Sequence, residues 1–166
     1  RLLGRKSSGG KADLLLVPSR HLFRIVAGWG GNGAVRHVPY AYDRIMAQQI
    51  ALVTLRTERH AGFQLVASSP LNAVTQPGLE NLISAVARLR LQCHLTVIGE
   101  GPALAALKAR ALQLAAADKV SFLASMPHPK MMEFFRAAKA YVDPCGSEGF
   151  PTFALHALSE GCPVVA

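Results

Sequence analysis

Glu148 and His156 are the residues near the C-terminal end of the chain whose types and spacing could do chemistry. Glu148 stands just before an apolar, helix-like run, and His156 lies eight positions later within that run. An ionised carboxylate only accepts hydrogen bonds, so Glu148 would suit the binding of ligand hydroxyl groups. From the residues alone, a solvent-exposed loop acid and a structural or surface histidine are the commoner interpretations.

Two glycine-rich motifs invite a nucleotide-binding interpretation, and neither satisfies it. GEGP, residues 99–102, follows a strand-like run and precedes a helix-like one, but the third glycine of the dinucleotide-binding pattern would fall on Leu104. GRKSSGGK, residues 4–11, has Gly10 where a P-loop requires lysine, and no strand precedes it. The sequence therefore predicts a sharp strand-to-helix turn at 99–102 and a basic loop at 4–11.

The composition predicts a soluble globular chain with one sizeable core. The chain has 166 residues, of which 51% are hydrophobic, and no stretch approaches the roughly 18 uninterrupted apolar residues of a membrane span. Cys93, Cys145 and Cys162 lie far apart and form no C-x-x-C pair, so we expect buried free thiols and no zinc site or disulfide framework. The chain also lacks a Ser/His/Asp or metal-ligand pattern.

Positive charge is concentrated in the first part of the chain. The net charge is +8, and residues 1–60 hold ten Lys and Arg against three acids, whereas residues 61–166 hold eight against seven. Such a segment could attract phosphates, nucleic acid or an anionic membrane surface. No nucleic-acid-binding module accompanies it, so we expect no nucleic-acid partner, while a peripheral membrane contact remains open. A small basic nucleic-acid binder is the weakest of the alternatives.

Short apolar runs alternate with helix-length segments over the second part of the chain. The predicted strands are 63–67, 95–99, 119–123, 140–144 and 163–166, and the predicted helices are 79–90, 103–116, 129–138 and 151–160. Continuous apolar strands joined by helices are typical of parallel strands that are buried on both faces. We therefore predict an α/β fold with a doubly wound, Rossmann-like parallel sheet.

The first part of the chain repeats this pattern once. Residues 12–30 read as strand, turn and helix, and residues 36–40 as another short strand. Residues 41–62 are polar, basic and weakly patterned, which is typical of a linker between two units.

Ligands of open parallel sheets bind outside the carboxyl ends of the strands, which selects four loops. These are residues 68–78, 99–102, 124–129 and 144–151. The last loop is the most suggestive, because Pro144, Gly146 and Gly149 favour a tight turn and Pro151 suits a first helical turn. Unpaired amides at the start of that helix would face an anion or sugar oxygens.

Five segments, taken in order, resemble the retaining family 4 glycosyltransferases of GT-B architecture. They are ADLLLVPSRHL, HVPYAYD, LTVIGEGPALAALKARA, DKVSFLASMPH and VDPCGSEGFPTFALHALSEGCPVVA. The resemblance implies two Rossmann-type domains that face each other across a cleft. By that resemblance, residues 1–43 are the tail of an N-terminal acceptor domain, 44–61 a linker, and 62–166 an incomplete C-terminal domain for the nucleotide-sugar donor.

The resemblance also implies an activity and a site. It implies metal-independent, retaining transfer of a sugar from a nucleotide-diphosphate sugar to an unknown acceptor, with no cofactor, in a cytoplasmic enzyme. Glu148 would take the catalytic position and contact the donor sugar. The implied donor-binding residues are Gly99, Glu100, Gly101, Gly149, Phe150 and His156, the last of them at the ribose.

Three departures from the family pattern leave a second interpretation open. The family usually carries an arginine where this chain has Ser68 or Ser69, and a lysine where it has Pro77. His156 takes the place of the second of two paired glutamates. The missing arginine and lysine slightly favour the alternative, second to the enzyme, that the chain is a non-catalytic GT-B-like protein that binds a nucleotide or a partner.

Overall fold

The computed structural model describes residues 14–28, 34–39, 62–144 and 152–166. They divide into two compact units, residues 1–41 and residues 42–166. The predicted linker at 44–61 and the basic loop at 4–11 lie outside the described residues. Within the described ranges, no helix has the length and apolarity that crossing a bilayer requires.

The described residues of the first unit form one β-α-β element. Strand β1 (Leu14–Val17) leads into helix α1 (Arg20–Ala27), and strand β2 (Ala34–His37) pairs with β1 in parallel. Ser19 caps the helix, since its side-chain oxygen accepts a hydrogen bond from the amide of Leu22 at 3.1 Å. The strand predicted at 36–40 is shifted toward the N-terminus, because its partner β1 ends at Val17, where the chain turns into α1.

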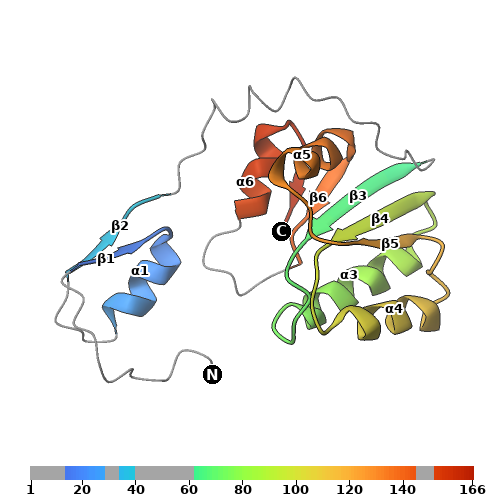
Figure 1. The fold of residues 1–166 in the computed structure, drawn as a ribbon, viewed down its shortest axis with the longest axis horizontal. Helices are drawn as coiled ribbons and strands as arrows, with labels where there is room; N and C mark the ends of the chain where they lie inside the picture. Colours follow the sequence, from blue (N-terminus) through green and yellow to red (C-terminus); the bar gives the residue numbers. More distant parts are fainter. Residues whose placement is uncertain (1–13, 29–33, 40–61, 145–151) are drawn as a thin grey trace. The chain divides into compact units, whose positions relative to one another are not determined.

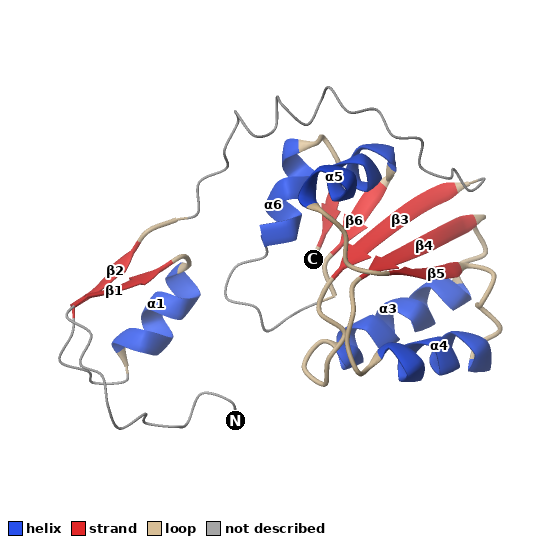
Figure 2. Cartoon of the chain, in the orientation of Figure 1, coloured by secondary structure: helices blue, strands red, loops and turns tan. Residues whose placement is uncertain are grey.

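The second unit is a five-stranded sheet in which every pairing is parallel, in the order β5-β4-β3-β6-β7 (Figures 1 and 2). Its strands are β3 (Phe63–Ser68), β4 (Cys93–Ile98), β5 (Val120–Leu123), β6 (Ala140–Val142) and β7 (Val164–Val165). Its helices are α3 (Gln76–Arg88), α4 (Leu104–Gln113), α5 (His128–Ala137) and α6 (Thr152–Ser159). The predicted doubly wound α/β fold is confirmed.

Helices cover both faces of this sheet (Figure 1), and the buried side chains form two apolar clusters. Leu79 and Ile83 of α3 pack with Leu107 of α4 on the face that receives Leu95 of β4. Residues of α5 and α6 form the second cluster, to which Ile98 of β4 contributes. Because successive strand residues point to opposite faces, β4 supplies both clusters and is buried along its whole length. Cys93 and Cys162 are buried free thiols, as predicted, and Cys145 lies outside the described residues.

The boundaries of two predicted helices were wrong for identifiable reasons. Helix α3 begins at Gln76, three residues before the predicted start, because Pro77 fits a first helical turn that needs no amide hydrogen there. Helix α4 ends at Gln113 and not at 116, because Ala115 adopts a left-handed backbone with a φ of 50°. The amides of Ala115 and Ala116 then donate to the carbonyls of Leu112 (3.0 Å) and Ala111 (2.9 Å). This is a Schellman C-terminus with alanine where glycine is usual.

Replacing Ala115 by glycine should raise the free energy of unfolding by about 0.5–1 kcal/mol, because glycine adopts the left-handed conformation without a Cβ clash. Urea or thermal unfolding measures the change. Gln113→Gly is the matched control: it lies in the exposed last turn of the same helix, and should lower stability by about 0.5–1 kcal/mol. Destabilisation by Ala115→Gly would contradict the Schellman assignment.

Candidate functional site

The loops that follow β3, β4 and β5 border a pocket at the carboxyl ends of these strands. The pocket has a volume of about 330 Å³. Its lining consists of Ser68, Ser69, Pro70, Ile98, Gly99, Glu100, Ser125, Met126, Met131 and Phe153. This lining contains one acid, Glu100, and no Lys or Arg among the described residues. The position is the one at which open parallel sheets bind ligands.

Backbone hydrogen bonds hold the loop after β3 against the loop after β4. The amide of Ser69 donates to the carbonyl of Ile98 at 3.1 Å, and the amide of Leu71 to the carbonyl of Glu100 at 2.9 Å. The carbonyl of Leu71 in turn accepts from the amide of Ala103 at 2.9 Å. The side chain of Leu71 is fully buried, so the paired loops are anchored in the core.

Gly99 and Gly101 permit this close approach of the two loops. A Cβ atom added at Gly99 would lie 2.0 Å from the carbonyl oxygen of Ser69. At Gly101 the corresponding distance to the carbonyl oxygen of Leu71 is 2.1 Å, and the backbone φ is 150°, which side chains rarely tolerate. The predicted sharp turn at 99–102 is therefore confirmed.

Glu100 connects the loops after β4 and β5. Its Oε1 accepts a hydrogen bond from the amide of Ser125 at 3.2 Å, while the residue as a whole stays exposed. A carboxylate held in this way is a positioned hydrogen-bond acceptor at the rim of the pocket.

The first turn of α3 contacts the segment that follows β6. A Cβ atom added at Gly78 would lie 1.9 Å from the carbonyl oxygen of Pro144, so only glycine fits there. Asn72 shapes the turn before the helix, because its Oδ1 accepts from the amides of Val74 (2.9 Å) and Thr75 (3.2 Å). The sequence interpretation did not identify Gly78, although the Pro-Gly pair ahead of a helix was an available signal.

His156 of α6 is paired with His128, the first residue of α5. Nε2 of His128 and Nδ1 of His156 lie 3.1 Å apart, and the rings meet edge to face with centroids 4.5 Å apart. The sequence interpretation selected His156 but missed His128, which lies 28 residues away and carries no local motif.

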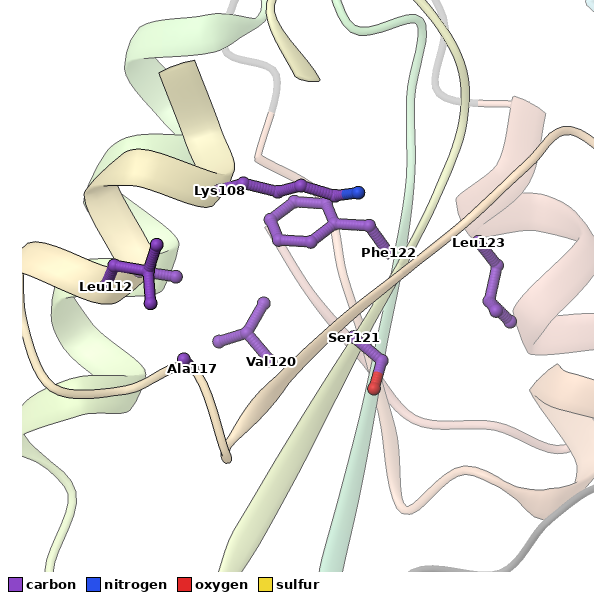
Figure 3. A pocket seen from close by; sticks show the side chains of 8 residues that line it. Lys108, Leu112, Ala117, Val120, Ser121, Phe122 and Leu123 are labelled. Atoms are coloured by element: carbon purple, nitrogen blue, oxygen red, sulfur yellow. The ribbon is translucent and has the colours of Figure 1, made fainter. Parts of the chain in front are cut away.

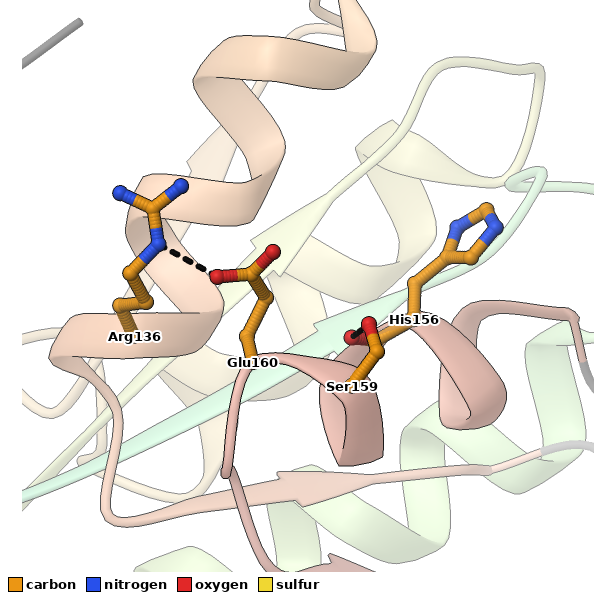
Figure 4. A network of polar contacts seen from close by, with 4 residues as sticks. All are labelled: Arg136, His156, Ser159 and Glu160. Carbon is orange, nitrogen blue, oxygen red and sulfur yellow. Dashed lines mark hydrogen bonds and ion pairs between the residues drawn. The ribbon is translucent and has the colours of Figure 1, made fainter. Parts of the chain in front are cut away.

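Burial is the main cause that lowers the pKa of His156; the neighbouring His128 lowers it further, whereas Glu160 raises it. Glu160 is itself ion-paired with Arg136 of α5 (Figure 4). Ser159 on the same turn donates from Oγ to the carbonyl of His156 at 2.6 Å (Figure 4). His156 therefore favours its neutral form in the folded protein.

The predicted site residues divide into those that the structure brings together and those that it does not describe. Gly99, Glu100 and Gly101 form one turn, and the first two line the pocket. His156 lies one helical turn beyond the pocket residue Phe153, with their ring centroids 6.4 Å apart. The remaining candidates, Glu148, Gly149 and Phe150, lie outside the described residues.

Ser68 and Ser69, where the resemblance leads one to expect arginine, line the pocket as buried residues. Ser68 contacts Met131, since its Oγ lies 3.8 Å from the methionine sulfur, and its carbonyl accepts from the hydroxyl of Tyr141 at 3.3 Å. Pro77, at the expected lysine position, lies in the first turn of α3. The pocket therefore has uncharged serine side chains at the position where the resemblance implies an arginine.

A second hollow of about 420 Å³ lies between α4 and the edge strand β5 (Figure 3). Leu112, Val120 and Phe122 supply apolar surface there, and Lys108 supplies the charge. The hollow runs along the side of the sheet and includes no loop at the carboxyl ends of β3 or β4. It is therefore a weaker candidate for the functional site than the strand-end pocket.

Solved structures with this fold are GT-B glycosyltransferases. Sucrose-phosphate synthase from Thermosynechococcus elongatus is similar over 92% of this chain and 40% of its own, with a TM-score of 0.71 and 20% identity. Anabaena Alr3699/HepE, solved in complex with UDP, is similar over 93% of this chain and 44% of its own, with a TM-score of 0.71 and 19% identity. The chain thus has the Rossmann-like fold of this class.

The sequence profile of the family described as "Glycosyl transferases group 1" matches residues 68–166, and the chain belongs to that family. A GDP-mannose-dependent alpha-(1-6)-phosphatidylinositol monomannoside mannosyltransferase of Mycolicibacterium smegmatis is 28% identical over 171 residues, covering 95% of this chain and 45% of the relative. A D-inositol 3-phosphate glycosyltransferase of Acidothermus cellulolyticus is 43% identical over 60 residues, or 36% of this chain and 13% of the relative. The chain spans less than half the length of these relatives.

Gly101→Ala should lower the free energy of unfolding by about 3 kcal/mol or more, because the new methyl group would overlap the Leu71 carbonyl and the backbone φ is unfavourable. Gly161→Ala is the control: Gly161 has a φ of 75° and nothing within 4 Å of an added Cβ, so only the conformational cost of about 1 kcal/mol remains. Chemical denaturation compares the two variants. Equal losses would show that the loop contact is not crowded.

Acidification should destabilise the fold through His156. The lowered pKa means that the unfolded chain binds a proton at a pH where folded His156 resists it. This residue therefore contributes stability above about pH 6.5 that is lost as the pH falls further. His156→Asn should reduce the pH dependence of the urea midpoint between about pH 7 and pH 5. His21→Asn, at an exposed position of α1, should leave it unchanged; identical curves for both variants would refute the assignment.

Proposed function

We propose that this chain is part of a glycosyltransferase that transfers a sugar from a nucleotide-diphosphate sugar to an acceptor. The observation that carries the proposal is the position of the pocket. The family match spans residues 68–166, and the pocket lies where the strands of that same region end. Family membership supplies the reaction class, and the location supplies a place for the donor.

Among the described residues, the proposed donor site consists of backbone groups more than of side chains. Gly99 and Gly101 let the loop after β3 pack directly against the turn, which fixes the position of the backbone that borders the pocket. The N-terminal end of α3 lies at the same end of the sheet and favours negative charge, such as that of a diphosphate. Glu100 offers an acceptor for a ligand hydroxyl at the rim.

The loop before α6 would complete the site. We assign the donor-sugar contact to Glu148 and further contacts to the amides of Gly149 and Phe150, on the strength of the resemblance alone. His156 would meet the ribose, and its position one turn beyond Phe153 is compatible with that role. Retention of configuration and independence of metal belong to the same family-based proposal.

GDP-mannose is the first donor to test, because the printed name of the M. smegmatis relative specifies it. The same name specifies a phosphatidylinositol mannoside as acceptor. A lipid acceptor would accord with a cytoplasmic enzyme that contacts the membrane peripherally through the basic residues 1–60. UDP-glucose is the second donor to test, since a solved structure with this fold holds UDP.

A non-catalytic, nucleotide-binding protein is the second candidate. Ser68, Ser69 and Pro77 stand where the resemblance implies cations that neutralise the donor diphosphate. Without those charges, binding could persist while leaving-group stabilisation is lost. Transfer of labelled mannose from GDP-mannose to a phosphatidylinositol mannoside separates the two candidates, because only the enzyme releases GDP in step with glycolipid formation.

Saturating GDP-mannose or UDP-glucose should raise the melting temperature of the full chain by several degrees, since a ligand at about 100 times its Kd adds about 2.7 kcal/mol. Glu148→Ala should weaken protection by the nucleotide sugar about tenfold while changing protection by GDP or UDP less, because only the sugar contact is removed. Asp118→Asn, an exposed acid before β5, is the control and should match the unaltered chain. No shift with any nucleotide would refute the donor-site assignment.

A further inference from the structure

The contact between His128 and His156 holds one proton between two facing nitrogens. At 3.1 Å the two atoms are at hydrogen-bond distance, so one ring donates and the other accepts. The other nitrogen of His128, Nδ1, is buried and has no hydrogen-bond partner among the described residues. A first added proton would make the pair a charge-assisted N–H⁺···N contact, which is stronger than the neutral one. A second proton would set two cations against each other.

Each histidine lies one helical turn from a residue that lines the strand-end pocket. Met131 lines the pocket and follows His128 by three residues on α5, and Phe153 lines it and precedes His156 by three residues on α6. Residues three apart share a helix face. The edge-to-face contact between Phe153 and His156 joins the pair to the pocket wall directly. A charge on the pair would therefore act on whatever occupies the pocket.

The described pocket lacks the positive charge that a diphosphate would require. Glu100 is the one charged residue of its described lining, and it is acidic. Every phosphate group of a nucleotide-diphosphate sugar adds negative charge, so the ligand and Glu100 repel each other. An added proton on the pair would offset that repulsion.

The described elements that pack around the pair carry several other titratable groups. Glu160 is the described carboxylate that raises the pKa of His156, and it is already ion-paired with Arg136. The other titratable groups of the packed elements are Lys130 and Glu133 on α5, Tyr141 on β6 and Cys162 before β7. Of these, the hydroxyl of Tyr141 is engaged with the carbonyl of Ser68, and burial raises the pKa of Cys162. Imidazole is the side chain whose ordinary pKa falls between about pH 5 and pH 7, so the two histidines are the groups to which we assign the added proton.

We propose that His128 and His156 form a proton-binding pair that supplies the positive charge for the anionic ligand of the pocket. Binding of a nucleotide-diphosphate sugar then takes up one proton from water, and the ligand binds more tightly as the pH falls. The proposal rests on the proposed function, because it requires a diphosphate in the pocket. His128 thereby has a role in ligand binding. The histidine pair, which becomes charged by protonation, takes the place of the permanently charged arginine and lysine that the resemblance implies.

The pH dependence follows from linkage between the proton and the ligand. Burial is the main cause that lowers the pKa of His156 in the absence of ligand, so His156 favours its neutral form near pH 7. A bound diphosphate raises the pKa of the pair, because it stabilises the protonated form. Affinity therefore increases as the pH falls through the pKa of the complex, and levels off below the pKa of the ligand-free protein.

Isothermal titration of the full chain with GDP-mannose from about pH 7.5 to about pH 5.5 tests the proposal. GDP-mannose is preferred to GDP because its phosphates are both esterified and keep their charge over this range. We expect affinity to increase roughly tenfold across the range, with close to one proton taken up in buffers of different ionisation enthalpy. Guanosine, which carries no phosphate, should bind with no such dependence.

Three variants identify the groups that take up the proton. His128→Asn and His156→Asn should each remove most of the pH dependence, with circular dichroism and melting curves confirming that the variants are folded. His156→Lys places a fixed positive charge at the same position, so it should bind GDP-mannose tightly at both ends of the range. His21→Asn, an exposed histidine of α1, should behave like the unaltered chain.

The outcomes separate this inference from the function on which it rests. GDP-mannose binding with no pH dependence, or a dependence that survives in both asparagine variants, would overturn the role of the pair and leave the donor site intact. If neither GDP-mannose nor UDP-glucose binds at any pH, the proposed function fails and the inference falls with it.

Discussion

The contact between the loops that follow β3 and β4 is the constraint on which the candidate site depends. The two strands pair in register up to Ser68 and Ile98, so their loops leave the sheet at the same level. The carbonyls of Ser69 and Leu71 lie directly against Gly99 and Gly101, where a Cβ atom would overlap them. Because a buried backbone must satisfy its hydrogen bonds, the loops bond to each other and form a fixed floor.

The strands that lead into these loops pack against two layers of helices, and each layer makes a different contact. Helices α3 and α4 form one apolar cluster with the sheet, and through Gly78 the start of α3 meets the carbonyl of Pro144. Helices α5 and α6 form the other cluster and bring His128 to His156. Strand β4 contributes to both clusters, so both layers pack on the strand that directly precedes Gly99.

Much of the fold and part of the site could be predicted from the sequence. Continuous apolar runs such as 95–98 identify buried parallel strands, and the turn at 99–102 follows from glycines between a strand and a helix. The helix boundaries were less accurate, because local capping decides them: Pro77 extends α3, and the left-handed Ala115 ends α4. Such effects depend on one or two backbone angles that a hydrophobic pattern does not encode.

The sequence by itself determined the class of fold, the order of its elements and the membership of a glycosyltransferase family, because periodicity and motif order are local properties of the chain. The tertiary structure alone decided which distant residues meet. Gly78 is required by a carbonyl 66 residues further on, and His128 meets His156 because α5 packs on α6. The physical reason is that burial and close approach are set by packing between elements, and the spacing along the chain does not specify it.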